Sequence, residues 1–207
     1  MKILKILNTN LSNSFSISFA LERLGYKVEF INNFQNVNNS ELIIIPGVGH
    51  FQKAIDNLSQ AINIHDIEKK NLKIFGICLG MQLLMSKSEE GDVNGLNLID
   101  GEVESLIKNK IYTVPNIGWK QVRFKDKRLS KFNDEYFYFV HSYAAFPKNS
   151  KNVLGEITLE NKIIPVVISE EHHEIGNYFG CQFHPEKSGE IGLSFLEAIL
   201  SIMNNDG

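Results

Sequence analysis

Cys78 lies between two glycines at a spacing that is typical of a catalytic nucleophile. The motif Gly76-Ile-Cys-Leu-Gly80 ends the apolar run at residues 72–77 and leads into a segment with the apolar spacing of a helix. Glycines two positions before and after the cysteine permit a sharp turn that lifts the sulfur clear of a sheet. The N–H groups at the helix start would favour the thiolate, and that of Leu79 would bind an oxyanion. We therefore interpret this segment as a nucleophile elbow.

A candidate base with its own carboxylate partner lies near the end of the chain, in His184-Pro-Glu186. In an extended segment, residues two apart point the same way, so both side chains would share one face. Glu186 would hold one ring nitrogen and stabilise the imidazolium, while the other nitrogen exchanges a proton with Cys78. A lone cysteine is more often a buried packing residue. The His-Pro-Glu motif in the same chain is what favours catalysis.

The loop Pro46-Gly-Val-Gly-His-Phe51 is a second candidate for binding an oxyanion or a carbonyl group. Its two glycines allow backbone N–H groups to approach a ligand closely. Most Pro-Gly-x-Gly loops are only turns, so the motif alone is weak evidence. We interpret His50 as a surface or helix-start residue rather than as a base.

Three further polar segments each have a functional interpretation and a purely structural one. Residues 88–92 read as a solvated acidic loop, in which Glu90 alone is kept as a site candidate. The triplet His141-Ser-Tyr143 ends an aromatic strand and would be costly to bury without partners, which predicts an edge or a pocket. Residues 170–174, Glu-Glu-His-His-Glu, read as an exposed loop, with a metal site as the weaker alternative because no HExxH spacing is present. Cys181 is three residues from His184, so in an extended segment its side chain would point to the opposite face; it reads as a packed strand residue.

Strands and helices alternate in the first half of the chain. Residues 2–7, 27–31, 41–45 and 72–77 read as strands. This alternation predicts an α/β fold, with a mostly parallel sheet flanked by helices and ligands at the carboxyl ends of the strands. Residues 97–169 read as a β-rich, partly antiparallel second half. The strands expected there are residues 111–114, 119–124, 136–140, 153–159 and 163–168, and an amphipathic helix is expected over residues 189–203.

Composition narrows the class of protein. The 207 residues are 43% hydrophobic and 22% charged, which fits one globular domain over residues 1–207. The net charge of -3 gives no positive electrostatic field that would attract the phosphate backbone of a nucleic acid. Nucleic acid is therefore not expected as a partner, and neither is a membrane, because no apolar run has the length of a span. Two cysteines and no secretory leader favour a reducing cytoplasm.

Taken together, the motifs resemble the class I glutamine amidotransferases, whose glutaminase domains have a flavodoxin-like fold. Specifically, they are similar to the HisH family, the glutaminase subunits of imidazole glycerol phosphate synthase in histidine biosynthesis. The resemblance rests on the Pro46 loop, on Gly76-Ile-Cys-Leu-Gly-Met-Gln-Leu-Leu84, on Phe139-Val-His-Ser-Tyr143, on Gln182-Phe-His-Pro-Glu-Lys-Ser188 and on Ile117-Gly-Trp119.

This resemblance implies a role for each matching residue. Cys78, His184 and Glu186 would form a catalytic triad, and Val48 and Leu79 would give the oxyanion N–H groups. The residues implied to line the glutamine pocket are Gly49, Gln82, Glu90, His141, Ser142 and Tyr143. The family needs no metal or organic cofactor. It passes ammonia to a (β/α)8-barrel cyclase subunit, with which the chain would form a heterodimer.

Two departures from the family pattern leave alternatives open. The first loop, Thr9-Asn-Leu-Ser-Asn-Ser14, keeps only Asn13 of the usual Tyr-Gly-x-Gly-Asn-Leu, and Lys120 follows Trp119 where the family usually has Asn. In the family the first loop faces the synthase partner. One alternative is therefore a paralogue that supplies ammonia to a sugar amidotransferase in surface polysaccharide synthesis. A cysteine peptidase or γ-glutamyl hydrolase with the same triad is another, against which the Gly-Met-Gln-Leu-Leu and His-Ser-Tyr elements argue. A catalytically silent module would need a lost nucleophile or base, and neither is lost here.

Overall fold

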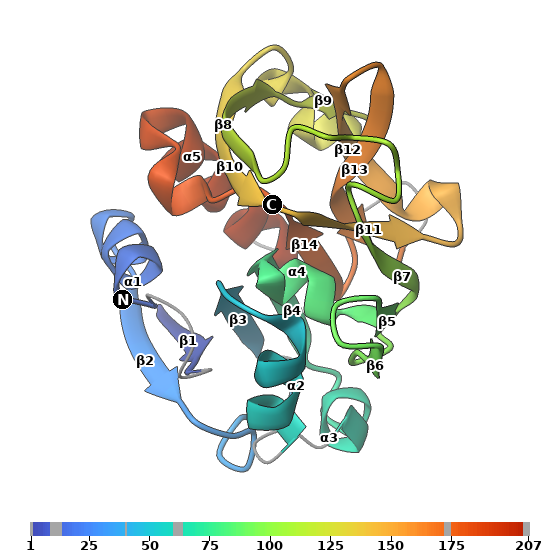
Figure 1. Ribbon diagram of the computed structural model, residues 1–207. Helices are drawn as coiled ribbons and strands as arrows, with labels where there is room; N and C mark the ends of the chain where they lie inside the picture. Colours follow the sequence, from blue (N-terminus) through green and yellow to red (C-terminus); the bar gives the residue numbers. More distant parts are fainter. Residues whose placement is uncertain (1, 9–13, 40, 60–63, 172–174, 205–207) are drawn as a thin grey trace.

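A central sheet organises the computed structural model, which describes residues 2–8, 14–39, 41–59, 64–171 and 175–204. Within these ranges the strands form three sheets, of eight, four and two strands. One side of the largest sheet is parallel and consists, in order, of β2 (Lys27–Ile31), β1 (Ile3–Leu7), β3 (Leu42–Gly47), β4 (Lys73–Cys78) and β14 (Tyr178–Cys181). The other side is antiparallel and continues with β13 (Lys162–Ser169), β12 (Val153–Leu159) and β9 (Arg123–Phe124). The predicted α/β class is confirmed (Figure 1).

Helices cover both faces of the parallel side. α1 (Ser14–Arg23) and α5 (Gly189–Met203) pack on one face, while α2 (Phe51–Ser59), α3 (Ile64–Lys69) and α4 (Leu79–Leu83) pack on the other. The strand β3 shows why, because its apolar residues alternate between the two sides. Leu42 and Ile44 join the core under α1 and α5, whereas Ile43 and Ile45 join the core under α2 and α4.

The smaller sheets come mostly from the β-rich second half predicted at residues 97–169, although two of their strands, β5 and β6, precede it. The four-stranded sheet contains β11 (Tyr143–Pro147), β7 (Ile99–Ser105), β5 (Met85–Ser88) and β6 (Val93–Asn94). The two-stranded sheet pairs β10 (Tyr136–His141) with β8 (Asn116–Gln121) in an antiparallel ladder. Three short 3-10 helices complete the described chain: η1 (Lys127–Phe132), η2 (Ser150–Asn152) and η3 (Pro185–Lys187).

One predicted strand of the second half is wrong, and another is divided in two. Residues 111–114 form no strand, because the N–H groups of Tyr112 and Thr113 donate to the Glu160 carboxylate at 3.2 and 2.9 Å rather than to a neighbouring strand. The expected strand at 119–124 is two strands, β8 and β9, which belong to different sheets. The break falls at Val122, which is buried between them. The strands predicted at 136–140, 153–159 and 163–168 and the C-terminal helix are confirmed.

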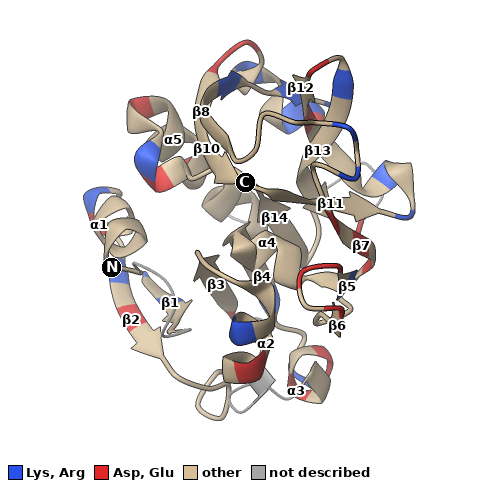
Figure 2. Cartoon of the chain, in the orientation of Figure 1, with Lys and Arg blue, Asp and Glu red and all other residues tan. Residues whose placement is uncertain are grey.

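Charged residues of both signs are interspersed over the chain, as Figure 2 shows. The short helix α4, which follows Cys78 directly, carries no charged side chain. In the part of the chain that the structure describes, no helix is long and apolar enough to cross a membrane.

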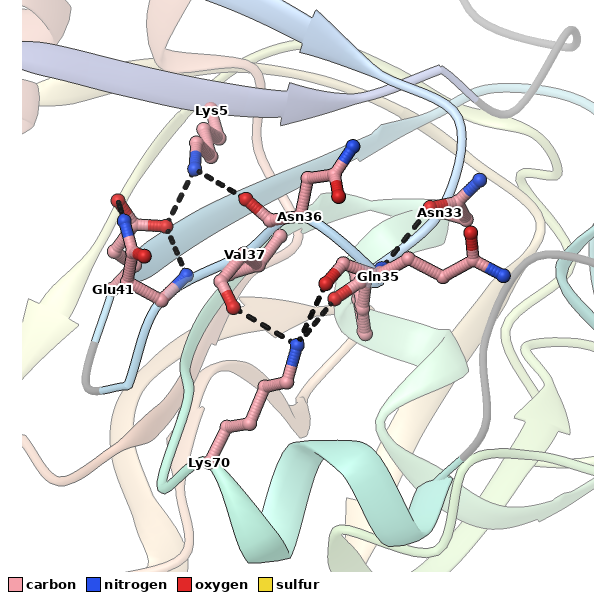
Figure 3. A network of polar contacts seen from close by, with 9 residues as sticks. Lys5, Asn33, Gln35, Asn36, Val37, Glu41 and Lys70 are labelled. Carbon is pink, nitrogen blue, oxygen red and sulfur yellow. Dashed lines mark hydrogen bonds and ion pairs between the residues drawn. The ribbon is translucent and has the colours of Figure 1, made fainter.

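The connection from β2 to β3 is held by lysine side chains in place of helical hydrogen bonds. Its described residues 32–39 contain no helix, so their carbonyl groups need other donors. The Lys70 ammonium donates to the carbonyl oxygens of Phe34, Gln35 and Val37 at 2.7, 3.1 and 2.9 Å (Figure 3). Phe34 and Val37 are thereby buried against the core beneath α2 and α3.

The partly buried pair Lys5–Glu41 closes the other end of this connection (Figure 3). The ammonium of Lys5 lies 2.6 Å from Oε2 of Glu41. Burial alone would raise the pKa of Glu41, but the hydrogen bonds from Lys5 and Asn38 lower it. Lys5 thus fixes the residue that precedes β3, while Lys70 fixes the middle of the connection.

We expect Lys70→Met to lower the free energy of unfolding by about 2 kcal/mol, because it removes charged hydrogen bonds to three carbonyl groups. The matched control is Lys69→Met, which changes an exposed lysine of α3 and should stay within about 0.5 kcal/mol of the original chain. Urea unfolding followed by circular dichroism measures both. Equal stability of the two variants would contradict the role of Lys70.

Candidate active site

Cys78 occupies a strained turn at the carboxyl end of β4. It is the last residue of the strand and precedes α4 directly, with φ 55° and ψ −108°. A non-glycine residue with positive φ is strained, and such residues cluster at functional sites. The side chain is 6% exposed. The sulfur is thus presented at the end of a parallel strand, where the sequence predicted a nucleophile elbow.

Close packing of α4 on the sheet holds this turn in place. A Cβ atom at Gly80 would overlap the carbonyl oxygen of Ile45 on β3, and one at Gly76 would overlap the carbonyl of Gly80. Because a backbone carbonyl has little room to move, only glycine fits at these two positions. The two glycines that flank Cys78 therefore serve close approach, as the sequence motif predicted.

His184 and Glu186 form a buried pair beside the elbow. Nδ1 of His184 lies 2.8 Å from Oε1 of Glu186, and the side chains are 3% and 8% exposed. The pair does not lie on an extended strand as predicted, because β14 ends at Cys181 and Glu186 belongs to the turn η3, which begins at Pro185. A 3-10 turn after His184 still brings the carboxylate back to its ring. The predicted contact is present, with a different local structure.

The environment of His184 favours its protonated form. Burial alone would lower the pKa of the ring, but the Cys78 sulfur and the Glu186 carboxylate outweigh it and raise the pKa from 6.5 to about 10. Nε2 of His184 and Oε2 of Glu186 are buried without a hydrogen-bonding partner among the described residues. The ring can therefore hold a proton on Nδ1 and exchange another through Nε2.

A cleft of about 320 Å³ opens at the elbow. It is lined by Val48, Gly49, Cys78, Leu79, Gln82, Glu90, Pro115, Val140, His141, Ser142 and Tyr143. The structure thus brings together the nucleophile, both oxyanion candidates and all six pocket residues that were predicted from the sequence. Pro115 and Val140 were not predicted. His184 and Glu186 line a separate small hollow of about 20 Å³, which Val48 also borders.

The Pro46 loop lies directly against the elbow. Its first two residues, Pro46 and Gly47, end β3, and Gly47 pairs with Cys78 on β4. A Cβ atom at Gly47 would come within 2.8 Å of Cβ of Leu79, so the backbone touches the start of α4 here. Val48 is 36% exposed and Leu79 is buried. The two segments whose N–H groups were predicted to bind an oxyanion are therefore neighbours at the mouth of the cleft.

Glu90 connects the wall of the cleft to this loop. Its Oε2 accepts a hydrogen bond of 2.7 Å from the N–H of Phe51, the first residue of α2, where a carboxylate is favoured by the helix dipole. The side chain is 16% exposed, so it is not part of a fully solvated loop. His50 is exposed, and its Nδ1 accepts from the N–H of Gln52 at 3.2 Å, which fits the predicted helix-start role.

A buried polar network supports the far wall of the cleft. His141 is 6% exposed and its Nδ1 lies 2.8 Å from the carbonyl oxygen of Tyr143. Burial lowers the pKa of His141 to about 4, so the ring is neutral near neutral pH. Asn116 contacts its other nitrogen at 2.8 Å. The predicted pocket location of the His141-Ser-Tyr143 triplet is confirmed. The role of Asn116 was not predicted, because nothing in the sequence beyond its position near Trp119 pointed to the site.

Two other expectations have different outcomes. Cys181 is buried on β14 and burial raises its pKa, as expected for a packed strand residue. Glu171 is exposed as predicted, but Glu170 is half-buried and accepts from the N–H of Tyr178 at 2.8 Å. Residues 172–174, which carried the weaker metal hypothesis, lie outside the described residues. Within the described ranges, no group of three potential metal ligands is present.

Comparisons with known proteins show the family of this chain. The family model "Glutamine amidotransferase class-I" matches residues 5–200. The chain is 36% identical over 199 residues to the imidazole glycerol phosphate synthase subunit HisH of Pasteurella multocida, which covers 95% of this chain and 96% of the relative. It is 39% identical over 204 residues to the HisH subunit of Staphylococcus aureus strain Mu50, with 97% and 98% covered.

Solved structures with lower identity share the fold. PurLQS from Thermotoga maritima matches with a TM-score of 0.70 at 18% identity, over 98% of this chain and 99% of that one. A glutamine amidotransferase from the same organism matches with a TM-score of 0.61 at 16% identity, over 99% and 85%.

We predict that His184 titrates with a pKa near 10 and that Glu186→Gln lowers this value by at least about 1 pH unit. Because the pKa of His184 is higher in the folded chain than in the unfolded chain, protonation of this ring stabilises the folded state. That contribution to the free energy of unfolding is complete below pH about 6.5 and is lost as the pH rises toward 10. Nitrogen-15 NMR of the histidine rings measures the titration.

The matched control for this titration is Glu171→Gln, which removes an exposed carboxylate and should leave His184 unchanged. A value near 6.5 for His184 in the original chain would show that the buried imidazolium does not form.

Proposed function

Because this chain belongs to the class I glutamine amidotransferases, in the group of the HisH subunits of imidazole glycerol phosphate synthase, we propose that Cys78 attacks the side-chain amide of L-glutamine. The chain is a glutamine-hydrolysing enzyme that releases glutamate and ammonia. The observation that carries the assignment of residues is the strained elbow at Cys78 beside the buried His184–Glu186 pair. We take residues 1–207 as one glutaminase domain, which the pairing of the late strand β14 with β4 supports.

In the first half of the reaction, the Cys78 thiolate attacks the γ-carbonyl carbon of glutamine. A carbon–sulfur bond forms, and the His184 imidazolium gives a proton to the amide nitrogen as the carbon–nitrogen bond breaks. Ammonia leaves and a γ-glutamyl thioester remains. The raised pKa of His184 supports this role, since the ring enters the step already protonated.

In the second half, water hydrolyses the thioester. His184, now neutral, accepts a proton from water as the new carbon–oxygen bond forms, and the sulfur leaves as thiolate. Glu186 keeps the ring orientation through its 2.8 Å contact to Nδ1. Each tetrahedral intermediate carries an oxyanion, for which we propose the N–H groups of Val48 and Leu79 as donors.

The size of the cleft supports a small amino acid as substrate. Its volume of about 320 Å³ suits one glutamine, and we propose that Gly49, Gln82, Glu90, His141, Ser142 and Tyr143 form its walls. The carboxylate of Glu90 offers the charge that the α-ammonium group of the substrate needs. His141, being buried and neutral, acts by holding the wall formed by Tyr143.

The partner that receives the ammonia is, in our proposal, a (β/α)8-barrel cyclase subunit in a heterodimer. The relatives' names, which identify them as subunits of a synthase, support it. Exposed apolar side chains on the two-stranded sheet also support binding to another chain, since Ile117, Trp119 and Tyr136 are each at least half exposed. The altered first loop, residues 9–13, lies outside the described residues.

Glutamate release from glutamine should rise strongly when the chain is mixed with the histidine-pathway cyclase of its organism and the ribotide ligand of that cyclase. Cys78→Ala is the control and should lower the rate by at least about 10⁴-fold, because the nucleophile is lost. Its folding is checked by circular dichroism, and a small residue is tolerated at the elbow. A folded Cys78→Ala variant with the full rate would refute the assignment of the nucleophile.

The same mixture decides between partners. A chain that hydrolyses glutamine but is not stimulated by the cyclase would point to the alternative acceptor, a sugar amidotransferase of surface polysaccharide synthesis. Ready cleavage of peptides would point to a peptidase instead.

A further inference from the structure

A buried side-chain amide contacts the nucleophile from the protein side. Gln182 follows β14 by one residue and is 0% exposed. Its Nε2 donates a hydrogen bond to the Cys78 sulfur at 3.5 Å. The sulfur also lies 3.9 Å from the Val140 carbonyl oxygen, which accepts only from a protonated thiol, and it interacts with the ring of His184. Gln182 is therefore a donor placed where a thiolate needs one.

The orientation of this amide is fixed by its neighbours. A carbonyl oxygen only accepts hydrogen bonds, so the atom of Gln82 that lies 2.9 Å from the Tyr143 carbonyl must be the nitrogen. The same Nε2 lies 3.0 Å from Oε1 of Gln182. The oxygen of Gln182 must then face Gln82, which turns its NH₂ group toward Cys78.

The same carbonyl also fixes the ring of His141. Nδ1 of His141 donates to the Tyr143 oxygen at 2.8 Å, so its Nε2 accepts from Nδ2 of Asn116 at 2.8 Å. Burial lowers the pKa of His141 to about 4, which agrees with this neutral tautomer. Each hydrogen bond between Asn116 and the Cys78 sulfur thus has a defined donor and a defined acceptor.

A donor of this kind favours the anionic sulfur. A thiolate is a stronger hydrogen-bond acceptor than a thiol, so a fixed N–H stabilises the charged form and holds it in one direction. The network is buried, and a buried amide that lost its orientation would leave polar groups unpaired. These contacts link four segments of the chain. Gln82 of α4 and His141 at the end of β10 both donate to the carbonyl oxygen of Tyr143 at the start of β11, and Gln82 also donates to Gln182 after β14.

We propose that Gln182 is a positioning residue, whose side-chain amide holds and stabilises the Cys78 thiolate for attack. The proposal rests on the proposed function, because it assumes that Cys78 is the nucleophile for glutamine. It adds that the orientation of the donor is set by Gln82 through the Tyr143 carbonyl.

The other titratable groups around Cys78 remain in place when Gln182 is changed. They are His184 with its partner Glu186, the neutral His141, Glu90 at the cleft, and Tyr143 and Cys181, whose pKa values burial raises. Replacing Gln182 by methionine keeps much of the side-chain volume and removes only the amide. The variant removes the donor to Cys78 together with the Oε1 atom that accepts from Gln82, while Gln82 keeps its hydrogen bond to the Tyr143 carbonyl.

The test is the pH dependence of Cys78 alkylation by iodoacetamide, followed by mass spectrometry of the peptide that contains Cys78. Gln182→Met should move the alkylation profile to higher pH by about 1 pH unit, because one hydrogen bond to the charged form is lost. It should lower kcat for glutamine by about tenfold and leave KM within about twofold. The control, Gln35→Met, changes an exposed glutamine and should leave the profile and both constants unchanged.

An unchanged alkylation profile in folded Gln182→Met would overturn the proposal. If that variant does not fold, the side-chain amide protons of Gln182 are followed by NMR in the original chain as the pH changes. They should shift with the titration of Cys78 and lose this response in Cys78→Ala; amide protons that do not respond would equally overturn it. Since alkylation needs no glutamine, a chain that is alkylated but releases no glutamate would reject the proposed function while still deciding the role of Gln182.

Discussion

The left-handed backbone at Cys78 is the constraint on which the rest of the site depends. A non-glycine residue at φ 55° and ψ −108° costs about 1–3 kcal/mol, so the surrounding structure must hold it. Contact between α4 and the parallel strands supplies that support, since Gly76 and Gly80 bring helix and sheet to backbone contact. The same packing sets the N–H of Leu79 and the Pro46 loop at one mouth of the cleft.

Electrostatics then determine what the held sulfur can do. A buried imidazolium is costly unless it is paired, and His184 is paired with both the Cys78 sulfur and the Glu186 carboxylate. His141, which is also buried, has no carboxylate partner among the described residues and stays neutral. Two buried histidines close to one another thus hold different protonation states, because in the described part of the chain His184 has anionic neighbours and His141 has none. One ring can transfer protons while the other supports the wall of the cleft.

The sequence could predict the elbow and the His-Pro-Glu pair because each depends on residues within a few positions. It could not place Gln182 beside Cys78, because the two are 104 positions apart and only the pairing of β14 with β4 brings them together. The strand expected at residues 111–114 failed for a related reason: the distant Glu160 binds its N–H groups. The apolar residues of this segment indicate which side chains are buried, but the partners of its backbone N–H groups are determined by tertiary contacts.

The most direct test of the account is covalent labelling with a diazoketone analogue of glutamine, which alkylates the residue that attacks the side-chain carbonyl position. The chain is treated in the presence of its synthase partner, and the labelled peptide is identified by mass spectrometry. We predict that the label is on Cys78 and that glutamine protects against it. Label on Cys181, or no label on a folded chain, would contradict the assignment of Cys78 as the nucleophile.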